Sequence, residues 1–234
     1  MKLNTIENID CMEGFKEIPD NSIDFTLTDI PYAEVSRDSN GLRNLDKEAA
    51  DILTFDLLGF LKEVYRVTKN SCCIFCGREQ FSEIYSFFAK KDGTTRPIVW
   101  EKTNPSPMNG QFIYLSGVEF AVWFKKSGAK VFNASCKNTV FRYGSGKNDI
   151  HPTQKNVELF KELILDNTNK NDIVFDPCMG SGTTAVAAIE TGRNYYGFEL
   201  DKNYYYKIME RLTGCSYEVE EVPEEKKIQK AELW

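Results

Sequence analysis

The stretch Phe175-Asp176-Pro177-Cys178-Met179-Gly180-Ser181-Gly182-Thr183-Thr184 decides the fold of this chain. The apolar run 172–175 before it predicts a strand, and the alanine-rich run 184–190 after it predicts a helix. A strand, a tight glycine turn and a helix in this order are typical of α/β proteins that bind a nucleotide-like cofactor. Such a turn can also serve only to pack a helix close to a strand, so this stretch alone leaves both interpretations open.

The residues around the turn narrow the kind of cofactor. No Gly-Lys-Ser/Thr follows, which excludes a P-loop, and Ala185 stands where the hydride-cofactor fingerprint has its third glycine. The next apolar run, 194–199, ends in Glu199, about twenty residues after the turn, where an acid reaches a ribose hydroxyl pair. Glu199 is therefore the candidate ribose ligand, with a solvated acid at a strand end as the alternative.

A second apolar run, 23–27, ends in Thr28-Asp29-Ile30-Pro31-Tyr32. Together the two stretches resemble the cofactor site and the catalytic tetrapeptide of the amino-group DNA methyltransferases. These enzymes methylate adenine N6 or cytosine N4 with S-adenosylmethionine. The family usually has Asp-Pro-Pro-Tyr, and Ile30 here keeps the carbonyl but loses one fixed φ angle. An ordinary turn after a strand would use the same residue types.

The resemblance implies catalytic roles for Asp29, Ile30, Pro31 and Tyr32. An exocyclic amine is a poor nucleophile because its lone pair is delocalised into the ring. Asp29 and the carbonyl of Ile30 would each accept one amino hydrogen, and Pro31 favours the extended geometry that aims this carbonyl. Tyr32 would stack on a base extruded from the duplex.

Two further segments resemble the same family. In Asn8-Ile9-Asp10-Cys11, Asp10 would contact the adenine amino group of the cofactor, although a helix N-cap uses the same residue type. In His151-Pro152-Thr153-Gln154-Lys155, Thr153 and Lys155 would hold the methionine carboxylate of the cofactor at a helix N-terminus. His151 would be an orienting residue and not a general base. The full set expected to bind the cofactor is Asp10, Asp29, Thr153, Lys155, Phe175, Asp176, Pro177, Gly180, Gly182, Thr183 and Glu199.

The order of the motifs predicts the organisation of the chain. The tetrapeptide comes first and the glycines come last, a circular permutation that marks the β class of the family. The resemblance implies an α/β, Rossmann-like fold with a mostly parallel central sheet, helices on both faces and a small recognition insert. We expect a catalytic half at 1–124, a target-recognition loop at 125–150, a cofactor-binding half at 151–212 and an acidic C-terminal tail at 213–234.

The distribution of charge predicts where DNA is contacted. The net charge of −6 argues against DNA binding only when it is read globally, because residues 125–148 contain no Asp or Glu. Basic and aromatic residues alternate there, which suits phosphates and bases, although a solvated hairpin is the alternative. Arg37 and Arg43 lie in a segment after Tyr32 that could cover a flipped base. The expected DNA contacts are Arg37, Arg43, Lys125, Lys126, Lys130, Lys137, Arg142 and Lys147.

Composition indicates a cytoplasmic protein. The chain of 234 residues is long enough to bury a sizeable core and has no long apolar run or leader segment. Its seven cysteines are not a disulfide framework. Cys73-x-x-Cys76 resembles half a zinc site, but the run 71–77 is more typical of a buried parallel strand, so we expect no metal. A homodimer is left open, and no membrane partner is expected.

These observations predict an S-adenosylmethionine-dependent DNA methyltransferase that acts on duplex DNA at N6 of adenine. The methyl group would pass directly to the extruded base, with the protein supplying proximity and aimed acceptors. Asp at the head of the tetrapeptide is common in the adenine enzymes of this class, whereas Ser is more typical of cytosine N4 enzymes. Cytosine N4 methylation, an RNA substrate and a non-catalytic DNA-binding module that kept the fold are the alternatives.

Overall fold

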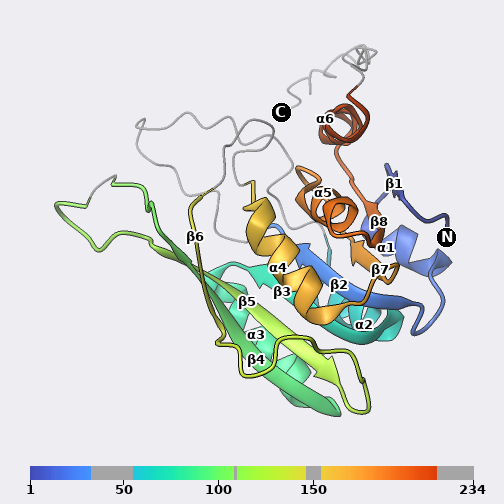
Figure 1. Cartoon of the computed structure of the whole chain (residues 1–234), viewed down its shortest axis with the longest axis horizontal. Helices are drawn as coiled ribbons and strands as arrows, with labels where there is room; N and C mark the ends of the chain where they lie inside the picture. The colour runs from blue at the N-terminus through green and yellow to red at the C-terminus, as the bar shows by residue number, and fades with distance from the viewer. Residues whose placement is uncertain (33–54, 108–109, 146–153, 215–234) are drawn as a thin grey trace, which may run out of the picture.

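The structure is a computed structural model that describes residues 1–32, 55–107, 110–145 and 154–214. Its centre is an eight-stranded sheet with helices on both faces (Figure 1). The strand order is β1-β8-β7-β2-β3-β5-β4-β6. Strand β5 runs antiparallel to both neighbours, and every other pair of neighbouring strands is parallel. The predicted Rossmann-like, mostly parallel sheet is confirmed.

The strands and helices alternate as expected for this fold. The strands are β1 (Thr5–Glu7), β2 (Ile23–Asp29), β3 (Thr68–Cys76), β4 (Gly93–Lys102), β5 (Val118–Lys126), β6 (Val140–Tyr143), β7 (Ile173–Asp176) and β8 (Asn194–Phe198). The helices are α1 (Cys11–Gly14), the 3₁₀ turn η1 (Phe15–Glu17), α2 (Leu57–Val67), α3 (Arg78–Ala89), α4 (Val157–Asn167), α5 (Thr183–Glu190) and α6 (Lys202–Thr213). Among the helices of these described residues, none is both long enough and apolar enough to cross a membrane.

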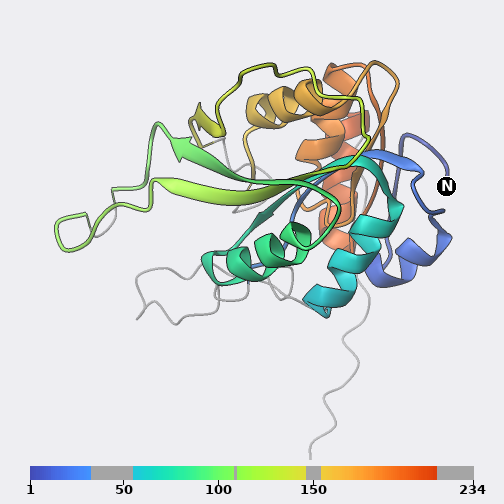
Figure 2. The ribbon, with the colours of Figure 1, turned by 90° about the horizontal axis from the view of Figure 1, so that it is seen from below.

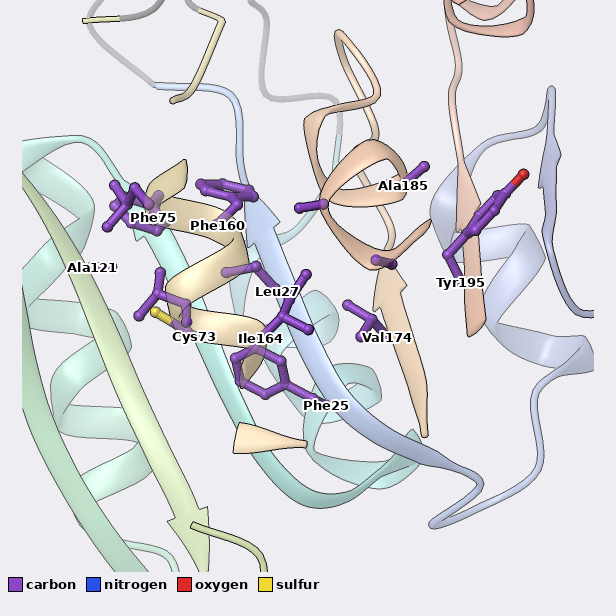
Figure 3. Packing of buried hydrophobic residues seen from close by; sticks show 14 of the residues in the cluster. Phe25, Leu27, Cys73, Phe75, Ala121, Phe160, Ile164, Val174, Ala185 and Tyr195 are labelled. Atoms are coloured by element: carbon purple, nitrogen blue, oxygen red, sulfur yellow. The ribbon is translucent and has the colours of Figure 1, made fainter. Parts of the chain in front are cut away.

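Each face of the sheet carries its own apolar core. On one face, Phe25 and Leu27 of β2 pack with Phe160 and Ile164 of α4 and with the alanines of α5 (Figure 3). On the other face, α1, η1, α2 and α3 cover a second cluster that includes Phe15, Phe60, Phe88 and Phe175, all fully buried, among other residues. Alternation along each strand explains the division, because successive side chains point to opposite faces.

The two cysteines that resemble half a zinc site belong to different cores. Cys73 lies in the cluster beneath α4, and Cys76 lies in the cluster beneath α2 and α3. Residues three apart on a strand point to opposite faces, so the two thiols cannot converge on one ion. Burial also raises the pKa of the Cys76 thiol to about 12, which disfavours the thiolate that a metal needs.

The order of the strands fixes where a ligand can bind. Strands β2 and β7 are neighbours, and the chain proceeds from β2 to β3 on one side and from β7 to β8 on the other. Open α/β sheets bind ligands at such a switch point, outside the carboxyl ends of the strands. We call this end the carboxyl edge. It carries Asp29, Asp176 and Glu199, and also the first residues of β5, because that strand is antiparallel.

The expected loop at 125–150 differs from the structure over residues 140–143. These residues form β6, which pairs with β4 in parallel register. Phe141 is buried in the core, and the Trp100 indole N–H donates to the Tyr143 carbonyl at 2.9 Å. Strand β6 has only four residues, so the sequence could not distinguish it from aromatic residues on a basic loop. Helix α6 was also not predicted, and most of the acidic tail lies outside the described residues.

Candidate active site

The catalytic tetrapeptide begins at the last residue of β2. The Asp29 carboxylate receives a hydrogen bond from the Lys155 ammonium at 2.5 Å and another from the Tyr32 hydroxyl at 3.1 Å. The Lys155 ammonium also lies 3.1 Å from the Tyr32 hydroxyl. Lys155 comes from the segment before α4, more than a hundred residues along the chain. The fold therefore brings the tetrapeptide and the second predicted segment together.

Two residues that the sequence reasoning missed complete this cluster. Glu119, near the start of β5, lies 3.1 Å from the Lys155 ammonium and 3.3 Å from the Tyr32 hydroxyl. Lys102, the last residue of β4, lies 2.5 Å from the other oxygen of Glu119. The signal in the sequence was one acid at the start of the apolar run 118–124. We call Asp29, Tyr32, Lys102, Glu119 and Lys155 the carboxylate cluster.

Burial and charge oppose each other in the carboxylate cluster. Burial raises the pKa of Asp29, and the nearby Lys155 ammonium counteracts that rise. For Glu119, burial acts in the same sense, but Lys155 and Lys102 together hold its pKa below the usual value. Burial disfavours the charged form of Lys155, yet Asp29, Tyr32 and Glu119 raise its pKa well above the usual value. The ammonium is therefore charged throughout the physiological range.

Lys155 thus has a different setting from the one expected. The resemblance implied a contact with the methionine carboxylate of the cofactor. In the structure the side chain is only 4% exposed, and its ammonium faces two carboxylates and one hydroxyl. An ammonium has three donors, and these three partners use all of them. Lys155 is accordingly placed at the Asp29 carboxylate.

Ile30 has structural roles that explain why it can replace the usual proline. Its backbone N–H donates to the Phe75 carbonyl at 3.1 Å, which extends the pairing of β2 with β3. Its side chain is 1% exposed and lies in the second core cluster. Proline would remove this donor and part of this packing.

We expect Ile30→Pro to lower the free energy of unfolding by about 1–3 kcal/mol, because a buried acceptor loses its partner and the core loses volume. Activity of the folded protein should stay within about tenfold, or roughly 1.4 kcal/mol, since the carbonyl is kept. Urea denaturation and methyl transfer would measure the two effects. Ile30→Val keeps the N–H and is the control; equal stability of the two variants would contradict the role of the hydrogen bond.

The glycine turn leaves β7 and opens α5. Gly180 and Gly182 both have left-handed backbones, with φ of +55° and +75°. A side-chain carbon on Gly182 would meet Ile208 of α6 at 2.7 Å, so this glycine permits close packing. The same carbon on Gly180 would find, among the described residues, only the Cys178 carbonyl, at 3.9 Å. Gly180 therefore faces open space at the carboxyl edge, as a cradle for a ligand requires.

Other residues of the turn are engaged inside the protein. Phe175 is fully buried and packs against Phe15, Tyr196 and Phe198, so it supports the turn from below. Pro177 is also buried. Asp176 accepts hydrogen bonds from the hydroxyls of Thr28 and Thr184 and from the Cys178 N–H. Burial raises the pKa of Asp176 to about 7. These contacts fix the turn relative to β2.

Glu199 is well placed for the ribose role. One of its carboxylate oxygens accepts from the Gly180 N–H at 2.7 Å, and the other accepts from the Asp201 N–H at 2.9 Å. Burial raises the pKa of Glu199 to about 7. The two oxygens of a carboxylate offer about four acceptor sites, so Glu199 keeps capacity for a hydroxyl beside these backbone donors. The two N–H groups hold Glu199 against the cradle, and this fits the predicted cofactor.

Three predicted cofactor ligands remain, and each has a different setting. Asp10 is the N-cap of α1, with its side chain accepting from the Met12 N–H at 2.8 Å, which is the alternative that the sequence left open. The hydroxyl of Thr183, at the start of α5, lies 3.0 Å from the Ser181 hydroxyl and 3.4 Å from the Lys155 carbonyl. Thr153 lies outside the described residues.

Among the described residues, the basic side chains expected to contact DNA lie at both ends of the strands. Lys125 and Lys126 end β5 at the edge opposite the active site, and Lys130 follows them. Lys137 contacts Glu162 and Asp166 at 2.7 and 2.6 Å, which offsets its charge. Arg142 is exposed but paired with Glu101 at 2.9 Å. Arg37, Arg43 and Lys147 lie outside the described residues.

An exposed apolar hairpin, whose tip includes Phe112 and Tyr114, has its base at the active site. The chain between β4 and β5 leaves the sheet after Lys102 and returns just before Glu119, and it extends beyond the rest of the sheet (Figure 2). Its segment 103–117 contains no charged residue. Phe112 is 80% exposed and Tyr114 is fully exposed.

Comparisons with known proteins agree with this geometry. A family model described as DNA methylase, for N6 and N4 methyltransferases, matches residues 23–210. The Type II methyltransferase M.HinfI of Haemophilus influenzae is 29% identical over 86% of this chain, which spans 66% of that protein. The DNA adenine methyltransferase YhdJ of Escherichia coli is 28% identical, over 95% of this chain and 87% of its own length.

A solved structure supports the cofactor as well as the fold. The M1.HpyAVI complex with S-adenosylmethionine is 30% identical, with a TM-score of 0.69, and the match covers 88% of this chain and 98% of that one. The family match covers most of the chain and contains the tetrapeptide, the glycine turn and Glu199. The chain therefore belongs to the N6 and N4 DNA methylase family, with S-adenosylmethionine as its methyl donor.

Proposed function

We propose that this protein methylates N6 of adenine in duplex DNA, with Asp29 as the acceptor for the target amine. The proposal rests on the hydrogen bond that joins the strand of the tetrapeptide to the strand of the glycine turn. The Thr28 hydroxyl of β2 donates to the Asp176 carboxylate of β7 at 2.7 Å. This bond ties the strand that ends in Asp29 to the strand that opens the cofactor cradle. A methyl donor and an amine can thus meet at one edge.

The residues of the site have distinct tasks in this proposal. S-adenosylmethionine, when bound, supplies an electrophilic methyl group. Gly180 leaves room for it, and the Glu199 carboxylate offers an acceptor to its ribose. The Asp29 carboxylate accepts a hydrogen bond from the amine, which increases electron density on nitrogen, and it is the nearby acceptor for the proton that the methylated amine loses. Tyr32 is held by its hydroxyl, so that its ring can present a face to the base.

The preference for adenine over cytosine has two supports. The tetrapeptide begins with Asp29, as is common in adenine enzymes of this family, and YhdJ is named as an adenine methyltransferase. Cytosine N4 methylation is the alternative within the family, and its exocyclic amine presents the same two hydrogens.

Sequencing of host DNA for modified bases tests the proposal in the cell. Strains with the intact gene, without it, and with an Asp29→Ala allele would be compared. We expect N6-methyladenine at a defined sequence only with the intact gene. N4-methylcytosine in its place would support the alternative, and methylation retained with the Asp29→Ala allele would contradict the role of Asp29.

We also propose that the hairpin tip contacts the duplex and fills the space left by the extruded base. Apolar side chains inserted between base steps are a common way to unstack DNA. The double variant Phe112→Ala/Tyr114→Ala should lose at least about tenfold in methyl transfer to duplex DNA, roughly 1.4 kcal/mol. Transfer to single-stranded DNA of the same sequence should change little, because its bases are already unstacked.

Phe132→Ala is the matched control for the hairpin. Phe132 is 45% exposed but packs on Trp123, away from the hairpin. Both variants would be assayed with labelled cofactor on the two substrates. An equal loss on duplex and single strand in the hairpin variant would argue that the tip supports the active site itself, and no loss on either would remove the tip from DNA binding.

A further inference from the structure

The carboxylate cluster places more charge beside the target amine than hydrogen bonding to that amine requires. Two carboxylates, Asp29 and Glu119, share the ammonium of Lys155, at 2.5 and 3.1 Å. Lys102 binds the second oxygen of Glu119 at 2.5 Å. The described side chains thus form a chain of alternating charge, from Asp29 through Lys155 and Glu119 to Lys102.

The side chains of this chain are shielded from solvent to different degrees. The side chain of Lys155 is 4% exposed, and those of Asp29, Glu119 and Lys102 are about one-fifth exposed. Charges in such a setting are poorly screened, so each one strongly affects its neighbours. Two carboxylates that share a site disfavour each other's ionised form, whereas an ammonium between them favours both.

The charge of Asp29 matters because only its ionised form is a full acceptor. A protonated Asp29 would have one O–H donor directed at the target amine or at its own neighbours. Burial alone acts toward this protonated form. Lys155 lowers the pKa of Asp29 and Glu119 raises it, and neither residue needs to touch the base to do so.

We infer that Lys155 and Glu119 are positioning residues that set the orientation and the charge of Asp29 for amine methylation. Lys155 binds the carboxylate at 2.5 Å and favours its ionised form. Glu119 holds Lys155 and the Tyr32 hydroxyl from the other side, and Lys102 keeps Glu119 ionised. This inference rests on the proposed function and names the residues that act through its catalytic acid.

The surroundings of Asp29 contain other titratable groups. Cys76 of β3 and Asp176 of β7 each interact with the charge of Asp29, and burial raises the pKa of both. Tyr32 also has a pKa well above its usual value, because of burial and the charge of Asp29. Glu79 of α3 acts on Cys76. Burial raises the pKa of Asp29 on balance, and the Lys155 ammonium acts most strongly against that rise, with the Tyr32 hydroxyl acting in the same sense.

The pH dependence of methyl transfer tests the inference. On the acidic side, activity rises as Asp29 loses its proton. Lys155→Met removes the charge that lowers the pKa of Asp29, so this acidic limb should move to higher pH. Glu119→Gln removes a charge that raises the pKa, so the limb should move to lower pH. The two shifts have opposite signs, which a general loss of structure would not produce.

Two further variants distinguish a shift in the pKa of Asp29 from a loss of folding. Lys155→Met leaves Asp29 without a cation and Glu119 with Lys102 alone, which can destabilise the site. The double variant Lys155→Met/Glu119→Gln removes one charge of each sign, and its acidic limb should lie between those of the single variants. Lys161→Met is the control, because Lys161 pairs with Glu158 and Glu190, away from Asp29, and its limb should coincide with the parent's.

A second readout does not depend on activity. The carboxyl carbon of Asp29 can be followed by ¹³C NMR across pH, assigned by its loss in Asp29→Asn, and should shift in the same directions. Unchanged limbs and unchanged NMR titrations in all variants would overturn the inference while leaving the proposed function intact. A parent protein without methyl transfer to any DNA would instead contradict the proposed function, and the NMR titration would still test the charge network.

Discussion

Asp29→Ala is expected to reduce methyl transfer by at least about 10²–10³-fold, because the target amine loses its aimed acceptor. Asp29 ends β2 and faces Lys155 and Tyr32, whereas the glycine turn and Glu199 follow β7 and β8. Cofactor affinity, measured by calorimetry, should therefore change far less than the rate measured with labelled cofactor on mixed-sequence DNA.

Asp29→Asn is the matched variant. It keeps the shape of the side chain and one carbonyl acceptor but removes the charge, so its rate should lie between those of the parent and Asp29→Ala. A near-normal rate in Asp29→Ala would remove this residue from the mechanism. Equal losses of rate and of cofactor affinity would place Asp29 in cofactor binding instead.

Gly180→Val is expected to abolish cofactor binding at concentrations that saturate the parent protein. Gly180 has a φ of +55°, and a side-chain carbon there would project into open space, with only the Cys178 carbonyl near it, at 3.9 Å. That space is where the cradle must admit its ligand. The variant also carries the strain of a left-handed valine, about 1–3 kcal/mol.

Gly128→Val separates these two effects. Gly128 has a φ of +77°, and in the described part of the chain no atom outside its neighbours would lie within 4 Å of an added side-chain carbon. It follows β5 at the edge opposite the active site. Thermal unfolding should show similar destabilisation in both valine variants, and calorimetry should show loss of cofactor binding in Gly180→Val alone. Normal binding in Gly180→Val would mean that the turn has another role.

The local chemistry of the sequence predicted most of the fold. The glycine turn and its flanking runs correspond to β7 and α5, and the run 71–77 corresponds to β3. Such segments are recognisable because a buried parallel strand and a turn with left-handed glycines need particular residue types. Strand β6 has only four residues and depends on pairing with β4, so no local pattern revealed it.

The active site was predictable in part for the same reason. Asp29 and Tyr32 stand in a compact motif, but their partners Glu119 and Lys102 come from other strands. Only the antiparallel direction of β5 brings Glu119 to the edge where Asp29 ends. Lys155 was expected to bind the cofactor, because the resemblance gave its motif and not the distance to Asp29. A count of charged residues likewise does not show which of them form ion pairs, such as Lys137 with Asp166.

The most direct test of the central claim is the identity of the methylated nucleoside. Purified protein would be incubated with labelled S-adenosylmethionine and mixed-sequence duplex DNA, which is then digested to nucleosides and separated, with Asp29→Ala in parallel. The parent protein should place the label in N6-methyldeoxyadenosine, and the variant should transfer at least about 10²-fold less. Label in another nucleoside, or in none, would contradict it.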